Sequence, residues 1–337
     1  MPDEPNPVDQ LDLPELVERV ERRLLGGERK YTRADVAERT NLAPDRAREL
    51  WRALGFATVD DDERAFTDGD VAALRQVAEL TEAMSLDDEV LRAMTRMLGR
   101  SYSRLASWQG QLVVEQLGKA PELLTSTDEL LDFLDSTLDT MQDVQDYVWR
   151  RQLAAYFSRV TANAGSTPAT GAATTMTVGF ADMAQFTAFT RRSSEAELRA
   201  VLEEFETLAT DTVAAHRGQI VKTIGDEVLF VTDDPADGAE IALGLLEGAD
   251  ASDLLPPLRV GLASGEVVLR LGDVFGQTVN IASRLTSLAR PDSVLVDEGM
   301  HEVLSDDARY RFSALRPASV RGYQHLRSWR LRHSQAT

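Results

Sequence analysis

Two short segments in the second half of the chain carry carboxylates whose surroundings fit polyphosphate chemistry. Asp182 lies in VGFADMAQFT, and Asp226 lies in VKTIGDEVLF. Two carboxylates that converge in an exposed loop region form an oxygen-ligand site of the kind preferred by Mg²⁺ or Mn²⁺. Such a pair can hold two ions, one that activates a hydroxyl nucleophile and one that neutralises a triphosphate. Each aspartate taken alone is equally compatible with ordinary turn chemistry.

A third segment, LGDVFGQTVNIASRLTSLA, supplies Asp273, Asn280 and Arg284. Asn280 and Arg284 are four positions apart, so they project from one face of a helix. An asparagine and an arginine on the first turns of a helix can position a ribose and neutralise a phosphate. The alternative is a solvated helix face that carries an ordinary arginine.

The elements that must position these residues alternate between strands and helices. Short apolar runs predict strands over 176–181, 219–224, 227–232, 258–264 and 293–296. Apolar residues at helical spacing predict helices over 193–217, 236–247 and 279–288. The Gly-Asp pair between the second and third strands predicts a hairpin. This order predicts an α+β domain with a ferredoxin-like antiparallel sheet covered by helices, in which the first strand lies beside the hairpin.

Two further features mark the ends of elements. Ser194 and Glu197 are spaced as a capping box at the start of the first of these helices. An antiparallel pairing of the first strand with the hairpin would bring Asp182 and Asp226 together. We therefore expect both carboxylates at one edge of the sheet.

Together, the three segments resemble the signature segments of the class III adenylyl and guanylyl cyclase catalytic domain. The resemblance covers about half of the chain, and it implies a catalytic domain over 176–332. It implies conversion of ATP to 3′,5′-cyclic AMP and pyrophosphate, with two Mg²⁺ or Mn²⁺ ions in each active site. It assigns metal binding to Asp182 and Asp226, together with Met183.

The resemblance also assigns the substrate contacts. Asn280 matches the residue that orients the ribose, and Arg284 matches the residue that stabilises charge on the phosphates. Lys222 and Asp273 match the pair that reads the base. A carboxylate accepts from the adenine N6 amino group and an ammonium donates to N1, whereas guanine presents the reverse pattern. ATP is therefore the expected substrate, and a guanylyl cyclase is the alternative.

The loop after the first aspartate departs from the family pattern. The family usually has a glycine before Phe-Thr, where backbone amides approach the triphosphate, and this chain has Gln185 there. Phe186 and Thr187 follow as the expected substrate-binding residues of the loop. A side chain at Gln185 could obstruct phosphate binding, so the departure predicts low activity.

In the family, the metal aspartates of one protomer face the base-reading and Asn/Arg residues of the other. The resemblance therefore implies a homodimer with shared active sites. The rival hypothesis is a regulatory or DNA-binding protein whose cyclase-like half only binds nucleotide or dimerises. The intact set of metal, base and phosphate residues favours the enzyme.

The first half of the chain has a different pattern of apolar residues. Apolar residues at helical spacing over 12–26, 82–115 and 128–160 predict an all-helical domain spanning 1–160. The small, polar stretch at 161–175, TANAGSTPATGAATT, predicts a linker. This layout resembles actinobacterial cyclases in which an N-terminal domain controls the catalytic one. Whether the domain inhibits or activates is left open.

Residues 31–66 resemble a degenerate helix-turn-helix with a wing-like segment over 59–66. Arg46, Arg48 and Arg52 would lie on its recognition helix, but that helix also carries acidic residues and the wing reads Asp-Asp-Asp-Glu. Because the segment lacks a basic footprint, we expect an interaction domain that does not bind DNA. Methionines at 84, 94 and 97 either line a pocket for a small-molecule or lipid ligand or belong to the core.

Composition narrows the alternatives further. The chain has 337 residues and a formal net charge of −20, which disfavours binding to nucleic acid and to anionic membranes. It has no cysteine, which excludes disulfides and thiolate chemistry. No run approaches the roughly 20 apolar residues of a membrane span, and no secretory signal is recognisable. We therefore expect a cytoplasmic protein.

Overall fold

The computed structural model describes residues 13–40, 42–120, 127–162 and 173–334. The chain divides into two compact units, Met1–Ala162 and Asn163–Thr337. Most of the segment predicted as a linker, 163–172, lies outside the described residues. The element before it continues to Ala162 and the strand after it begins at Ala173, so both extend into the predicted linker.

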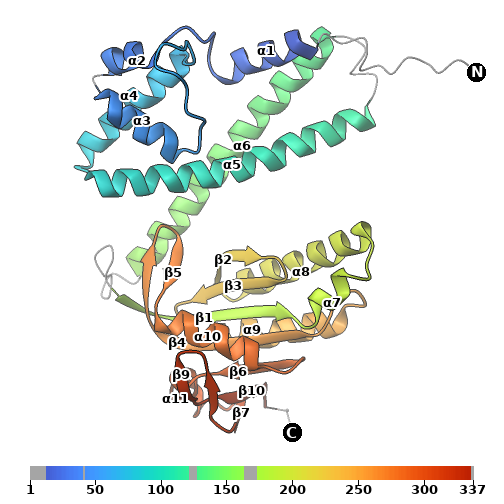
Figure 1. Cartoon of the computed structure of the whole chain (residues 1–337). Coiled ribbons are helices and arrows are strands. Elements are labelled where there is room, and N and C mark those ends of the chain that lie inside the picture. The colour runs from blue at the N-terminus through green and yellow to red at the C-terminus, as the bar shows by residue number, and fades with distance from the viewer. Residues whose placement is uncertain (1–12, 41, 121–126, 163–172, 335–337) are drawn as a thin grey trace, which may run out of the picture. The chain divides into compact units, whose positions relative to one another are not determined.

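The described part of the N-terminal unit is helical, as predicted. Its helices are α1 (Leu13–Leu24), α2 (Arg33–Thr40), α3 (Pro44–Ala53), α4 (Asp68–Ala83), α5 (Asp88–Lys119) and α6 (Thr127–Ala162) (Figure 1). One prediction is wrong in detail. The helix predicted over 82–115 is interrupted, because Ser85 has a positive φ of 51° and Asp87 caps the start of α5. In the wing-like segment 59–66, Phe66 forms a β-bridge with Tyr31.

The core of this unit gathers α2, α3, α4 and the beginning of α5. Val36, Leu50, Leu74 and Leu91 are buried there. The ring of Trp51 lies edge-on to that of Phe66, with centroids 4.8 Å apart. The unit therefore has an apolar core of its own.

The C-terminal unit combines one large sheet with five helices among its described residues. Its elements are β1 (Ala173–Met183), α7 (Phe186–Thr190), α8 (Glu195–Ala215), β2 (Gln219–Ile224), β3 (Glu227–Thr232), α9 (Pro235–Ala251), β4 (Leu258–Arg270), β5 (Asp273–Phe275), α10 (Gln277–Leu288), β6 (Ser293–Val296), α11 (Glu298–Leu304), β7 (Tyr310–Ala314), β8 (Ala318–Val320), β9 (Tyr323–Leu326) and β10 (Trp329–His333). The capping box at Ser194 and Glu197 is present.

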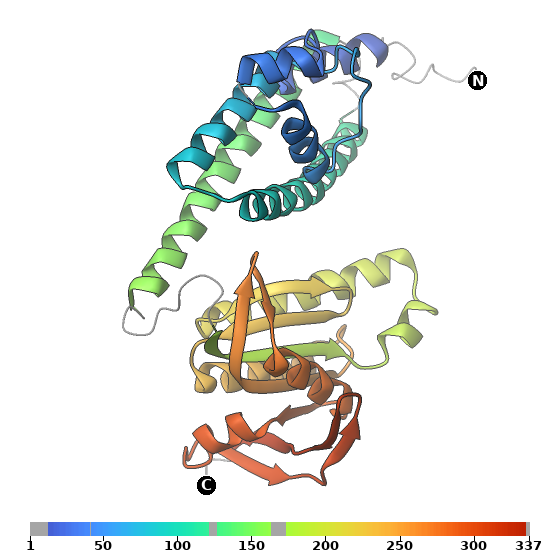
Figure 2. The same cartoon turned by 60° about the vertical axis from the view of Figure 1, so that its left-hand side comes forward.

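The strand order in the sheet is β2-β3-β1-β4-β6-β10-β7. The first four strands pair antiparallel in the ferredoxin-like order, which confirms the predicted fold class. The pairing of β4 with β6 is parallel, so the complete sheet is mixed. Figure 2 shows β4 and β5 as a hairpin that extends past the neighbouring strands.

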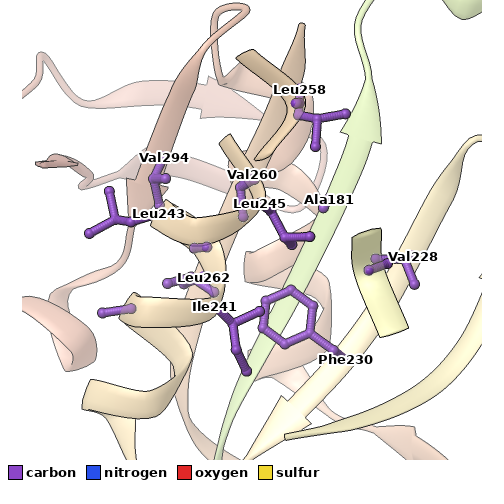
Figure 3. Packing of buried hydrophobic residues seen from close by; sticks show 14 of the residues in the cluster. Ala181, Val228, Phe230, Ile241, Leu243, Leu245, Leu258, Val260, Leu262 and Val294 are labelled. Carbon is purple, nitrogen blue, oxygen red and sulfur yellow. The ribbon is translucent and has the colours of Figure 1, made fainter. Parts of the chain in front are cut away.

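One face of the sheet is covered by α8 and α9. The core between these helices and the sheet includes four fully buried residues, Phe230, Ile241, Val260 and Leu262 (Figure 3). Gly179 lies opposite Phe230 in the β1–β3 pair, and a Cβ atom at this position would overlap the phenyl ring. The glycine is therefore needed to admit the aromatic ring.

The opposite face of the sheet carries α10. A Cβ atom at Gly261 of β4 would collide with the backbone of α10, so the glycine allows close approach of helix and strand. The hydroxyl of Thr286 donates to the carbonyl of Phe180 on β1 at 3.2 Å. These contacts fix α10 on the face that is not covered by α8 and α9.

Candidate active site

The predicted aspartates meet where β1 ends beside the β2–β3 hairpin. Asp182 is the second-last residue of β1, and Asp226 lies in the turn of the hairpin. The backbone N–H after Asp182 donates to the carbonyl of Asp226 at 3.1 Å, which closes the hairpin turn against the end of β1. Strand pairing places Asp182 opposite Glu227 on β3 and opposite Arg259 on β4. Three carboxylates and one guanidinium therefore share one edge of the site.

The electrostatics of this edge are dominated by burial. Burial raises the pKa of Asp182, the ion pair with Arg259 opposes that rise, and the neighbouring Asp226 adds to it. Burial raises the pKa of Glu227 to about 7, with further contributions from the negative charges of Asp182 and Asp226. Carboxylates crowded in this way repel one another, so the edge attracts cations.

The residues fit a divalent metal ion. Mg²⁺ typically binds one or two carboxylates and completes its coordination with water and substrate phosphates. Within the described residues, no three acidic or histidine side chains converge closely enough to hold an ion without such help. The side chain of Met183 is buried in the core, so this residue can offer only its backbone carbonyl. Asp182 and Asp226 therefore fit as carboxylate ligands of a divalent ion that completes its coordination with other oxygens.

The predicted base-reading residues form a second group. Lys222 on β2 donates from Nζ to Oδ2 of Asp273 on β5 at 2.5 Å. Both side chains are partly exposed, at 40% for the lysine and 31% for the aspartate. A donor and an acceptor thus lie side by side next to the turn of the β4–β5 hairpin, where a planar base could contact both.

A β-bulge sets the direction of Lys222. Ile220 pairs with Phe230, and Lys222 pairs with Leu229, so Val221 is an extra residue in β2. Phe230 belongs to the core under α8 and α9, whereas Leu229 belongs to the core under α10. Regular alternation would send Lys222 to the same side as Ile220, away from Asp273. The extra residue brings the ammonium onto the α10 side of the sheet.

The third group lies on α10. Buried positions of this helix, such as Ala282 and Leu285, face the sheet, while Asn280 is exposed and Arg284 is half-buried. Helical spacing puts Asn280 and Arg284 on the side turned away from the sheet. Neither side chain forms a hydrogen bond or ion pair with a described residue. Asn280 and Arg284 are therefore available to bind a group that comes from outside their own chain.

The loop after Asp182 explains the family's preference for glycine. Gln185 has φ 62° and ψ 20°, which is the left-handed conformation that glycine adopts without steric cost. Its side chain is exposed, and its carbonyl accepts from the backbone N–H groups of Ala188 and Phe189. Phe186 and Thr187 begin α7, where first-turn amides lack intrahelical acceptors. The glutamine therefore strains the backbone of the loop, while its exposed side chain points away from the loop interior.

Two residues that lie beside Asp182 were missed by the sequence analysis, Arg259 and Glu227. Arg259 looks like an ordinary strand residue in LLPPLRVGLASG, and only the β1–β4 register reveals that it faces Asp182. Glu227 follows directly after Asp226 and could have been found as the second acid of the hairpin turn. Its importance depends on its pairing with Asp182, which the sequence does not show.

The helix-turn-helix-like segment in the N-terminal unit has much of its positive charge neutralised. Arg46 pairs with Asp88 at 2.8 Å, and Arg48 pairs with Asp45 at 3.0 Å. Arg52 is exposed on the same helix. These ion pairs remove guanidinium groups that a phosphate backbone would need.

The methionines suggested for a ligand pocket lie in different surroundings. Met94 packs against the core, whereas Met84 and Met97 are exposed. A pocket in this unit is lined instead by other apolar residues, including Leu42, Leu50, Val77 and Leu91. Among the described residues, no helix combines the length and the apolar character needed to cross a bilayer.

Comparison with known proteins identifies the family of the chain. Residues 170–333 match the model of the adenylate and guanylate cyclase catalytic domain. A protein named adenylate cyclase from Streptomyces coelicolor is 44% identical over 287 residues, which cover 85% of this chain and 74% of the relative.

Two further relatives cover still more of the chain. An adenylate cyclase from Glutamicibacter nicotianae is 34% identical over 93% of this chain and 81% of its own. A protein named pH-sensitive adenylate cyclase from Mycobacterium tuberculosis is 31% identical over 92% of this chain and 80% of its own. The similarity includes the helical unit as well as the sheet that carries the carboxylates and the Lys–Asp pair. The chain therefore belongs to the class III family of adenylate and guanylate cyclases.

Proposed function

We propose that this protein is an adenylyl cyclase that converts ATP to 3′,5′-cyclic AMP and pyrophosphate. The observation that carries the proposal is the Lys222–Asp273 pair, which stands on the α10 side of the same sheet whose edge carries Asp182 and Asp226. The name adenylate cyclase of three relatives supports the choice of ATP. Guanylyl cyclase activity is the alternative within the family.

In this proposal Asp182 and Asp226 would hold two Mg²⁺ or Mn²⁺ ions, with the carbonyl of Met183 as a further oxygen ligand. When bound, these ions would lower the pKa of the ribose 3′-hydroxyl and neutralise the phosphates. The 3′-oxygen forms a bond to the α-phosphorus as the bond from that phosphorus to the bridging oxygen breaks. Pyrophosphate leaves and the hydroxyl proton is released, so the protein supplies mainly position and charge.

The base and the ribose are held by the other two groups. Asp273 accepts from the N6 amino group of adenine, and Lys222 donates to N1. Asn280 orients the ribose, and Arg284 stabilises the charge that develops on the phosphates. Phe186 and Thr187 bring backbone amides to the triphosphate.

The separation of these groups supports a homodimer with shared active sites. Asn280 and Arg284 face away from the sheet of their own chain and have no described partner, whereas Asp182 and Asp226 lie at its edge. A second copy related by a two-fold axis would bring the two halves together twice. A monomer would leave both halves incomplete.

We further propose that residues 1–160 form a regulatory domain, connected through 161–175 to the catalytic domain at 176–332. The curated relatives match both units, which supports a shared regulatory layout. A small-molecule or lipid ligand for the helical unit is part of this proposal. The neutralised arginines argue against DNA as a partner.

The test is cyclic nucleotide production by the full-length protein with ATP and with GTP in Mn²⁺. Asp226→Ala removes one proposed metal ligand, and Asp253→Ala, at an exposed aspartate after α9, is the matched control. Cyclic AMP formation that requires Asp226 and tolerates the control supports the proposal. Nucleotide binding without turnover in a dimeric protein would favour the binding-module alternative, and cyclic GMP as the main product would favour the guanylyl one.

A further inference from the structure

Arg259 forms an ion pair with Asp182, one of the two proposed metal ligands. The guanidinium of Arg259, on β4, is ion-paired with the carboxylate of Asp182, on β1. Their side chains are 30% and 18% exposed, so the pair is partly shielded from water. The strand register fixes it, because the two residues lie directly opposite each other.

We infer that Arg259 is a counter-ion that occupies Asp182 in the metal-free protein and must release it before a divalent ion can bind. This inference rests on the proposed function, since it takes Asp182 as a metal ligand. A divalent ion needs the carboxylate oxygens at close range, and Arg259 covers one of them. The two cations also repel each other, so each lowers the affinity of Asp182 for the other.

The ion pair with Asp182 leaves part of the Arg259 guanidinium without a described partner. Its Nε is buried and has no hydrogen-bond partner among the described residues. In the described part of the chain, Arg46 and Arg330 also have an unpaired Nε, so the case for Arg259 depends on its ion pair with Asp182. Guanidinium groups match the oxygens of phosphate groups in planar, bidentate fashion.

A polyphosphate that arrives with its metal ions offers the guanidinium another acceptor in place of Asp182. Metal alone must displace the guanidinium without offering it a new acceptor. The metal-free site is therefore held closed to cations by its own arginine, and the free protein binds divalent ions weakly.

The size of the effect follows from the electrostatics of such pairs. An opposite charge within about 4–6 Å shifts the affinity of a carboxylate for a proton by about one to three pKa units. Partial exposure places this pair at the lower end of that range. Removal of the positive charge should therefore tighten Mn²⁺ binding to the nucleotide-free protein about tenfold.

The experiment measures Mn²⁺ binding to the full-length protein without nucleotide, by electron paramagnetic resonance of free Mn²⁺. It is done at pH 8, so that loss of Arg259 does not simply protonate Asp182. Arg259→Gln removes the charge, and Arg259→Met does so while keeping the aliphatic stem, in case one variant does not fold. Arg259→Lys keeps the charge and should bind as weakly as the wild type.

Arg330→Gln is the matched control, because Arg330 is a half-buried strand arginine whose Nε is also unpaired. It lies on β10, away from Asp182, and should leave Mn²⁺ binding unchanged. Asp182→Asn identifies the binding that depends on the proposed ligand. Tightening by the two neutral variants alone supports the inference.

The outcomes separate the two levels of the proposal. If Mn²⁺ binding depends on Asp182 but Arg259→Gln and Arg259→Met bind no more tightly than the wild type, the counter-ion role is refuted and the metal site stands. If no variant shows binding that depends on Asp182, the metal site itself is refuted, and the inference falls with it.

Discussion

Replacement of Lys222 by alanine gives the sharpest test of substrate choice. The ammonium lies 2.5 Å from Asp273 and is proposed to donate to N1 of adenine. A hydrogen bond to a charged group contributes about 1.5–3 kcal/mol, and the partial exposure of this pair places it near the lower end. A loss of about 1.5–2 kcal/mol corresponds to a fall in kcat/KM for ATP of about 10- to 30-fold.

The same change should act differently on GTP. Guanine presents an N1–H donor where adenine presents an acceptor, so the ammonium of Lys222 opposes guanine and its removal costs GTP nothing. The ratio of kcat/KM for ATP to that for GTP should therefore fall at least about tenfold. Initial rates of cyclic AMP and cyclic GMP formation in Mn²⁺, at substrate concentrations below KM, measure that ratio.

The control and the refuting result are both simple. Lys119→Ala removes a lysine that pairs with Glu115 at 2.8 Å on the surface of α5, and it should leave the ratio unchanged. If Lys222→Ala lowers turnover of ATP and GTP by the same factor, the Lys222–Asp273 pair only holds the β4–β5 hairpin in place. Base recognition would then have to be assigned to other residues.

Three further changes test other parts of the structure. Burial raises the pKa of Asp297, the N-cap of α11, from its ordinary 3.8 to about 6. Between these two values the folded protein keeps a proton that the unfolded chain loses. The free energy of unfolding should therefore fall by about 3 kcal/mol as the pH rises from 4 to 6. Asp297→Asn should flatten this dependence in calorimetric melts, and an unchanged slope would contradict the assignment. Arg284→Ala should lower kcat about 100-fold with little change in KM, whereas a rise in KM alone would show ground-state binding. Gln185→Gly should relieve about 1 kcal/mol of strain at φ 62° and raise both the melting temperature and the rate; a lower rate would show that the glutamine side chain assists the reaction.

Local signals in the sequence predicted the elements around the site well. The Gly225-Asp226 turn gave the hairpin, and the strand over 293–296 has the predicted limits. Strand β4 runs on to Arg270, beyond the predicted end at 264, because its outer part pairs with β5. The three residues of β5 are too few to show a periodic pattern, so this strand could not be predicted.

The side-chain partnerships depend on register and were less accessible. Asp182 and Arg259 are 77 positions apart, and nothing local in either segment indicates that they face each other. The same holds for Lys222 and Asp273, which are 51 positions apart and were linked only through the family resemblance. A shift of one residue in either pairing would move the side chains to opposite sides of the sheet. Distant pairings are therefore the part of the site that only the folded chain reveals.

The bulge at Val221 gives β2 one residue more than the part of β3 that it faces. Deletion of Val221 would remove this extra residue but leave the lysine opposite Leu229, because the residue next to Ile220 in a regular strand lies on the other side of the sheet. Without a bulge, the present sequence would pair Val221 with Leu229 and turn Lys222 to the side lined by Ile220. The hairpin can therefore lose its extra residue without moving the lysine, whereas an insertion that the strand does not absorb as a bulge would carry the ammonium away from Asp273.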